Sequence, residues 1–337
     1  MEAYILKPGV DVLSRNIDDY PEGIIIPIDK PYRWTSADVI RKVKYAAIRH
    51  FGKKNLKVGH AGTLDPLATG VLLVCIGKAT KLAETLQSHD KEYVAGVTFG
   101  ATTPSYDLEK EIDRFFPHEH INAEAVEAAL PAFIGEQDQV APLFSAKSVD
   151  GVRAYELARK LHAEGKTLDE AAQELIRVSK INIAELELLN YHNVVVEAGF
   201  ENNPSHSYVV GPDQSCSRRL LAAKVHWTFC ETALDPCGQG GSTVFKTAPT
   251  TNVEKEEVVS KASSRINVTD NSALGLPRAE IRMACSKGTY VRAFARDLGE
   301  ALGSGAHLDS LQRSRSGEFR VENALTVDQA IALLSHS

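Results

Sequence analysis

The sequence lacks any long apolar run. No stretch of 18 or more apolar residues occurs in its 337 residues, whereas a helix that spans a membrane needs about 20. The first residues, MEAYILKPGVDVLSRNIDDYPEG, contain no continuous apolar segment and carry acidic residues early, unlike a secretory signal peptide. We therefore expect a cytoplasmic protein that does not enter a membrane.

Motifs for common cofactors are also absent from the sequence. It contains no GxGxxG and no P-loop, which are the glycine-rich loops that hold dinucleotide and nucleotide phosphates. Its five cysteines form no CxxC pair, and an odd number in a long chain without an export signal favours reduced thiols. A zinc site is conceivable among His206, Cys216, His226, Cys230 and Cys237, but their spacing supports one poorly. We expect neither a metal nor a cofactor.

Charge is distributed unevenly along the chain, whose net charge is −6. Between Ile40 and His60 there are seven basic residues and no acidic residue, whereas Glu84 to Asp138 holds twelve acids and three bases. A basic run of this kind is most often a solvated helix face. It could instead contact a nucleic acid, because such binding depends on where the charge lies rather than on the net charge.

Hydrophobic patterning predicts an α+β fold with a mixed or antiparallel sheet flanked by helices. Apolar or alternating runs predict strands at 23–28, 71–76, 91–100, 143–149, 178–196, 278–285 and 306–313. Helical patterns cover 37–50, 78–88, 122–134, 152–163, 168–176, 289–302 and 327–334. Ser36 is the expected cap of the first helix.

Composition divides the chain into three kinds of segment. Residues 1–22 form an irregular N-terminal extension, and residues 23–196 and 278–337 hold the predicted strands and helices. Residues 197–277 are rich in Ser, Thr, Asn and Gly, which is typical of a flexible insertion. The simplest interpretation of this insertion is a tolerated surface loop, and an element that binds RNA or a partner is the alternative.

The most informative segment is GHAGTLDPLATGVL, residues 59–72. Its glycines permit close approach by another molecule, and Pro66 disfavours helical geometry at Asp65. A carboxylate on such a loop can point into a cleft, although an Asp-Pro pair by itself more often builds only a turn.

This segment closely resembles the catalytic loop of the TruB family of tRNA pseudouridine synthases. Further segments resemble motifs of that family in the same order: DKPYRWTS at 29–36, DKEY at 90–93, SAK at 145–147 with GVRAYE at 151–156, and SKGTYVR at 286–292. The resemblance covers roughly residues 23–196 and 278–337 and implies a pseudouridine synthase-like catalytic domain. Arg33 and Trp34 replace the glycine and a smaller residue of the family's DKPxGxTS motif. Only about 45 residues follow Arg292, so we expect no C-terminal PUA domain.

The resemblance implies a role for each motif residue. Asp65 would be the catalytic nucleophile, and Arg292 would pair with it and keep it ionised and oriented. Tyr93 would stack near the flipped base and act in proton removal from its C5. Residues implied to contact or support the substrate are His60, Tyr290, Lys30 and Lys147. Because the reaction includes no redox step or group transfer, it needs no cofactor.

The implied activity is isomerisation of uridine to pseudouridine at position 55 in the T-loop of tRNA, on a base flipped out of its stack. We expect the partner to be the T-arm and the protein to be a monomer. One alternative is a tRNA-binding folding chaperone that needs no catalysis, and another is an RNA-guided synthase of the dyskerin kind. The intact set of Asp65, Tyr93 and Arg292 favours the enzyme.

Overall fold

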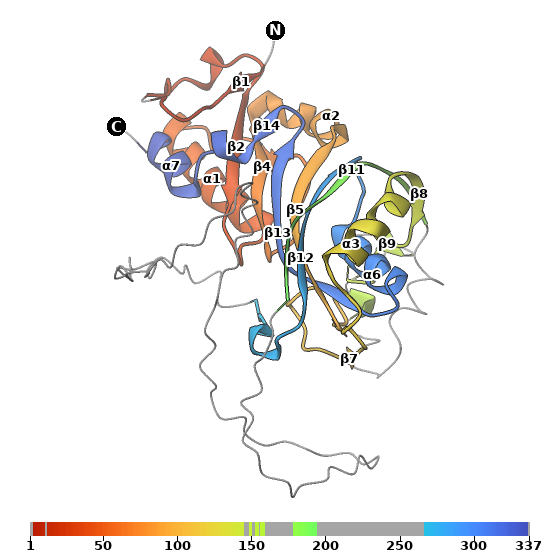
Figure 1. The fold of residues 1–337 in the computed structure, drawn as a ribbon. Coiled ribbons are helices and arrows are strands. Elements are labelled where there is room, and N and C mark those ends of the chain that lie inside the picture. The colour runs from red at the N-terminus through yellow and green to blue at the C-terminus, as the bar shows by residue number, and fades with distance from the viewer. Residues whose placement is uncertain are drawn as a thin grey trace, which may run out of the picture. The chain divides into compact units, whose positions relative to one another are not determined.

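A ten-stranded mixed sheet forms the centre of the structure (Figure 1). This computed structural model describes residues 3–10, 12–144, 148–149, 152–154, 156–158, 178–193 and 266–335. These ranges all belong to one unit, which comprises residues 1–195 and 259–337. The mixed sheet flanked by helices confirms the fold class that the sequence predicts.

The strand order brings distant parts of the chain together. The order across the sheet is β1 (Tyr4–Ile5), β2 (Ile24–Lys30), β4 (Ala68–Ile76), β13 (Ala306–Ser316), β5 (Lys91–Phe99), β12 (Arg278–Cys285), β11 (Ser179–His192) and β8 (Gly135–Gln139). In addition, β3 (Val58–His60) pairs with β4, and β14 (Phe319–Arg320) pairs with β13. The pairs β1–β2 and β4–β13 are parallel, and the other pairs are antiparallel. Strand β13, from the end of the chain, therefore lies between β4 and β5.

Two short hairpins lie outside this sheet. One pairs β6 (Ala101–Thr102) with β7 (Arg114–Phe115), and the other pairs β9 (Ser148–Val149) with β10 (Val152–Arg153).

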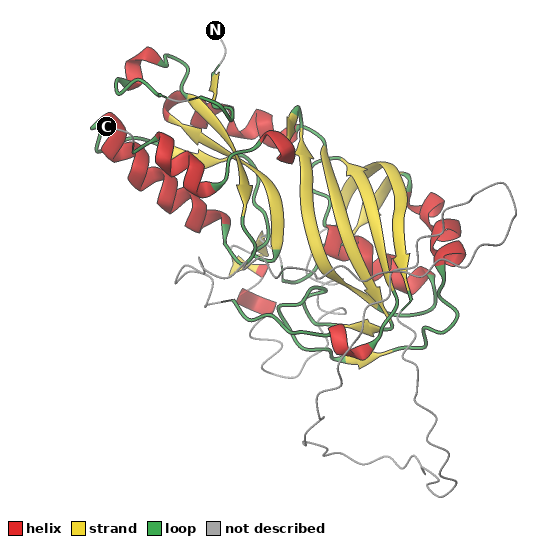
Figure 2. Ribbon diagram, turned by 60° about the vertical axis from the view of Figure 1, so that its left-hand side comes forward, coloured by secondary structure: helices red, strands yellow, loops and turns green. Residues whose placement is uncertain are grey.

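Four helices pack with the sheet into one apolar core. They are α1 (Ser36–Phe51), α3 (Ala123–Ala129), α6 (Val291–Ala301) and α7 (Val327–Leu333). In Figure 2, α1 and α7 form a pair of neighbouring helices. Because side chains alternate along a strand, the remaining apolar residues of β4 form a second, smaller cluster with α2 (Ala83–Ser88). No helix in the described ranges is long and apolar enough to cross a membrane.

Short 3-10 helices connect these elements. They are η1 (Ile17–Asp19), η2 (Gly77–Leu82), η3 (Leu130–Phe133), η5 (Ser272–Leu274) and η6 (Val321–Asn323). The predicted helix 78–88 is thus η2 followed by α2, and the predicted helix 122–134 is α3 followed by η3, with Asn122 as the N-cap.

Several local predictions differ from the structure. Thr35, not Ser36, caps α1, and it forms a capping box with Asp38. The N-terminal extension is not wholly irregular, because Tyr4–Ile5 extends the sheet and Leu6 is fully buried. The predicted helix 152–163 begins as a strand at Val152–Arg153. The predicted helix 168–176 lies outside the described residues.

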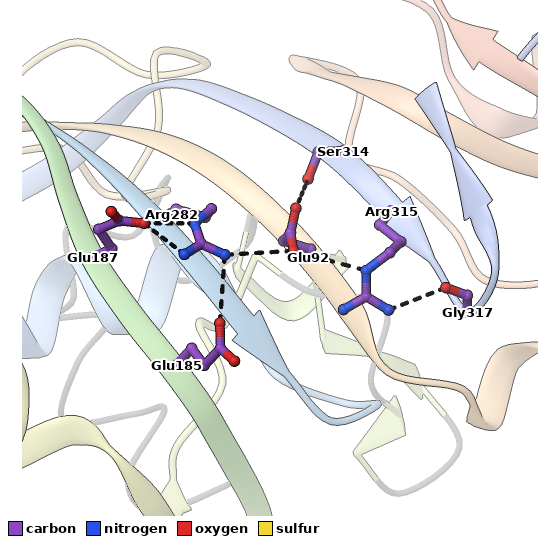
Figure 3. A network of polar contacts seen from close by, with 7 residues as sticks. All are labelled: Glu92, Glu185, Glu187, Arg282, Ser314, Arg315 and Gly317. Atoms are coloured by element: carbon purple, nitrogen blue, oxygen red, sulfur yellow. Dashed lines mark hydrogen bonds and ion pairs between the residues drawn. The ribbon is translucent and has the colours of Figure 1, made fainter. Parts of the chain in front are cut away.

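A polar network crosses the face of the sheet that lies opposite the core (Figure 3). The Arg282 guanidinium contacts the carboxylates of Glu187 at 2.6 Å and Glu92 at 3.8 Å. The Glu92 carboxylate also lies 3.7 Å from Arg315 Nε and accepts a 3.0 Å hydrogen bond from Ser314. Ion pairs as exposed as these contribute little stability individually. Together they connect four neighbouring strands of the sheet.

Candidate active site

The loop that carries Asp65 is held at both ends by hydrogen bonds. Ala61 N–H donates to the Leu73 carbonyl at 2.9 Å, and Leu64 N–H donates to the Ser36 hydroxyl oxygen at 3.0 Å. Gly70, at the far end, adopts a φ of +97°, and a Cβ there would lie 2.2 Å from the carbonyl oxygen of Arg313. Only glycine fits this close approach.

Asp65 and Arg292 form the ion pair that the motif resemblance implies. Arg292 lies in the first turn of α6, and its Nη2 is 2.9 Å from Asp65 Oδ2. The Arg292 side chain is 7% exposed, whereas that of Asp65 is 39% exposed. A largely buried guanidinium therefore orients a carboxylate that remains accessible to a substrate.

Asp107 is a second carboxylate on Arg292, and the sequence analysis did not identify it. Its Oδ2 lies 3.5 Å from Arg292 Nη1, which also donates to the Ser105 carbonyl at 3.1 Å. Asp107 is itself fixed by the Ser105 hydroxyl at 2.6 Å and the Glu109 amide at 2.9 Å. Burial lowers the pKa of Arg292, but the charges of Asp65 and Asp107 more than compensate and raise it. The segment TTPSYD predicts a polar turn, but it does not show that Asp107 contacts Arg292.

These residues line a shallow cleft that is partly open to solvent and has a cavity volume of about 20 Å³. Asp65, Asp107 and Arg292 form its charged part, and Leu67 and Leu308 are among its apolar lining residues. An apolar lining with a few converging polar groups is typical of ligand sites, but this cleft is far smaller than a whole nucleotide. In the described part of the chain, no group of three or more His, Cys, Asp or Glu side chains is arranged to hold a metal. The five residues considered for zinc lie outside it.

Tyr93 lies beside this cleft and not in its lining. It is buried in β5, and burial raises the pKa of its hydroxyl. The charge of Asp65 also raises that pKa, whereas the charge of Arg313 lowers it.

Comparisons with known proteins identify the family of the chain. Residues 49–202 match the model described as TruB family pseudouridylate synthase, N-terminal domain. The chain is 40% identical to tRNA pseudouridine synthase B of Phocaeicola vulgatus over 310 residues, which is 92% of each chain. The chain belongs to the TruB family of pseudouridylate synthases.

More distant relatives extend the comparison. The tRNA pseudouridine synthase B of Thermus thermophilus is 36% identical over 301 residues, which is 89% of this chain and 75% of that protein. A crystal structure of a Cbf5–Nop10–Gar1 complex is similar at a TM-score of 0.46 and 20% identity. That alignment covers 95% of this chain and 59% of the other, so the chain spans about three fifths of that protein's length.

The DK pair of the TruB-like N-terminal motif is bonded to the loop that carries Asp65. Lys30 is fully buried, and its Nζ donates to the carbonyls of Pro31 at 3.0 Å, Trp34 at 2.6 Å and Pro66 at 3.1 Å. Burial lowers the pKa of Lys30 to about 7, although Asp65 and Asp29 oppose the shift. Asp29 accepts a 3.0 Å bond from the Gly70 amide. Lys30 is therefore placed to support Asp65 through the neighbouring Pro66.

The other residues implied for substrate contact lie around the loop. His60, in β3, is half-buried, and burial lowers the pKa of its ring. Tyr290 caps α6, and its backbone exchanges two hydrogen bonds with the Gln139 side chain. Lys147 lies outside the described residues.

Arg33 occupies the place of the TruB motif glycine and keeps a glycine-like backbone, with φ at +63°. A non-glycine residue seldom adopts this conformation. Its Nη2 donates to the Ile266 carbonyl at 2.7 Å. Arg33 therefore adopts the backbone conformation that glycine favours.

Proposed function

We propose that the chain forms pseudouridine in tRNA, at position 55 of the T-loop, with Asp65 as the nucleophile. The observation that carries the proposal is the accessible carboxylate of Asp65, held 2.9 Å from a buried guanidinium at the edge of a cleft. Family membership and the names of the curated relatives support the reaction and the class of RNA.

The chemistry requires cleavage of the N-glycosidic bond, rotation of the base and formation of a carbon–carbon bond. A carboxylate suits the first step, because glycosidases use carboxylates at the same kind of sugar carbon. Arg292 would orient Asp65 throughout, and Asp107 would fix Arg292. Tyr93 would take part in removal of the C5 proton, which requires its hydroxyl to come close to the rotated base. The isomerisation conserves the atoms and electrons of the nucleotide, so it can be catalysed by the protein's own side chains without a cofactor.

The target base must leave its stack to reach Asp65. His60 is the last residue of β3, just before the loop that carries Asp65. Its ring would fill the space that the base vacates. A single-stranded RNA loop suits this mode of binding, because its unstacked bases can stack on aromatic and histidine side chains. Tyr290, at the start of α6, would support the extruded base.

The phosphate backbone would be bound by a basic face on α1 and the turn after it. We define this face by its exposed residues Arg41, Lys42, Lys44, Arg49, Lys53, Lys54 and Lys57. A helix of 16 residues is about 24 Å long. It begins at Ser36, which is bonded to Leu64 of the catalytic loop, and the chain returns to that loop through β3. An RNA arm along this face would thus lead to the cleft.

The test is to incubate the purified protein with an unmodified tRNA transcript and map pseudouridine. A single product at position 55 is expected, and a transcript with cytidine at that position should give none. Product elsewhere in the control transcript would refute the T-loop assignment. Binding of the transcript with no product at all would instead support the folding-chaperone alternative. The monomeric state and the cytoplasmic location stay predictions, and sedimentation analysis checks the first.

A further inference from the structure

Arg313 is a buried cation whose charge the proposed mechanism does not yet use. It lies in β13 and is 2% exposed. Its Nε donates to the Val71 carbonyl at 2.7 Å, its Nη2 to Gly62 at 3.2 Å and its Nη1 to Thr63 at 3.4 Å. Within the described residues, no carboxylate lies within ion-pair distance of it. A buried charge without a counter-ion is costly, so a purely structural role would more readily be filled by an apolar side chain.

The carbonyls that Arg313 binds lie on both sides of Asp65. Gly62 and Thr63 precede Asp65 in the chain, and Val71 follows it. A planar guanidinium can bind several fixed acceptors at once, which a lysine cannot do with the same geometry. Arg313 therefore ties the two arms of the catalytic loop to a central strand of the sheet.

Arg313 also faces Tyr93 directly. The two residues are paired in the antiparallel register of β13 and β5, so their side chains share one face of the sheet. The positive charge of the guanidinium lowers the pKa of the Tyr93 hydroxyl. On its other side, Arg313 pairs with Gly70 of β4. One side chain thus binds the loop of the proposed nucleophile and lies on the strand next to the proposed base.

Other titratable groups also face this pair. Asp65 of the catalytic loop and Cys285 of β12 act on Tyr93. The groups that feel the charge of Arg313 are Lys30 of β2, His60 of β3 and Lys91 of β5. Arg313 lowers the pKa of each of these three groups, so an experiment must separate its effect on Tyr93 from its effect on them.

We propose that Arg313 is a positioning residue that fixes the Asp65 loop against the sheet and places a positive charge beside Tyr93, its cross-strand neighbour. This inference rests on the proposed roles of Asp65 and Tyr93. The hydroxyl gives its proton to solvent, and its oxygen then accepts the proton from C5 while the electron pair of the C5–H bond stays in the base. The positive charge of Arg313 favours the intermediate phenolate.

The experiment compares Arg313→Met, Arg313→Lys and the control Arg315→Met. Arg315 lies two residues along the same strand and contacts Glu92 on the opposite face. In Arg313→Met we expect the single-turnover rate of pseudouridine formation to fall about tenfold to hundredfold, with tRNA affinity little changed. The rise of the rate with pH should move up by about one to two pH units. Arg313→Lys should keep the pH profile near that of wild type, and Arg315→Met should change neither quantity.

Two further readouts separate positioning from simple destabilisation. Replacing Tyr93 with 3-fluorotyrosine, whose hydroxyl is more acidic, should recover about tenfold of the rate lost in Arg313→Met. Amide hydrogen exchange over residues 61–70 should be faster in Arg313→Met than in wild type, and unchanged in Arg315→Met.

Two results would overturn the proposal. An unchanged pH profile without rescue by 3-fluorotyrosine would overturn the link between Arg313 and Tyr93, and an unchanged exchange rate would overturn the link between Arg313 and the loop. Hydrogen exchange is measured without tRNA, so it tests the role of Arg313 in holding the loop whether or not the protein is active. If wild type forms no pseudouridine, the proposed function is refuted, and the exchange result still tests the role of Arg313 in the loop. If Arg313→Met does not fold, the same measurements on Arg313→Lys decide, and a wild-type exchange rate there would contradict the proposal.

Discussion

Replacing Arg292 with methionine removes the charge that lies between two carboxylates. Asp107 is 7% exposed, and within the described residues its carboxylate would keep the Ser105 hydroxyl and the Glu109 amide as partners. Breaking a buried ion pair costs about 3–5 kcal/mol. Water screens Asp65, which is 39% exposed, so its share is small. We therefore expect the free energy of unfolding to fall by about 2–4 kcal/mol, nearly all of it because Asp107 loses its counter-charge.

A second substitution tests this origin. Asp107→Asn removes the unpaired buried charge, so Arg292→Met with Asp107→Asn should recover about 1–3 kcal/mol relative to Arg292→Met alone. Activity should not recover, because Asp65 still lacks its guanidinium. Urea denaturation measures the stability, and single-turnover pseudouridine formation measures the activity. A double variant less stable than Arg292→Met, or one with wild-type activity, would refute the reasoning.

Three other predictions follow from the loop and the basic face. Lys30→Met removes an amine whose folded pKa of about 7 lies below its unfolded value of 10.5. Above pH 7 the unfolded wild type binds more protons than the folded wild type, so its free energy of unfolding should rise with pH relative to that of the variant. The rise should reach about 1.4 kcal/mol per pH unit between pH 7 and 9. Urea titrations at several pH values measure this difference, and a relative fall in the stability of wild type would contradict the prediction. Gly70→Ala forces a Cβ onto the Arg313 carbonyl at positive φ, so we expect it to lower the free energy of unfolding by more than about 1 kcal/mol. A smaller loss would contradict the steric argument. Replacing both Lys42 and Lys44 with glutamine should lower the salt slope of tRNA binding by about two without changing the single-turnover rate at saturation, and an unchanged slope would exclude this face from phosphate binding.

The sequence predicts the regular elements well where one pattern dominates. The basic amphipathic run at 37–50 became α1, and the alternating run at 91–100 became β5, because burial of one face decides both. The ends are harder to predict. Thr35 and Ser36 are both good caps, and the choice between them depends on Leu64, to which Ser36 is bonded instead. The strand Tyr4–Ile5 is too short to show a period and exists through its pairing with β2.

The site shows the same division. Asp65, Tyr93 and Arg292 were predicted because each lies in a recognisable motif. Asp107 and Arg313 were missed, because an acid in a turn and an arginine in an exposed-looking strand, SLQRSRS, have no local sign of burial. Arg313 reaches the Asp65 loop because the strand order brings β13 between β4 and β5, and no local pattern contains that information.

The central claim is that the carboxylate of Asp65 performs the chemistry. The most direct measurement is single-turnover pseudouridine formation on unmodified tRNA by Asp65→Asn, with Asp138→Asn as a matched control at an exposed carboxylate. The account predicts normal tRNA binding and no product for Asp65→Asn, and wild-type behaviour for Asp138→Asn. Product formation by Asp65→Asn at a rate near that of wild type would contradict the account.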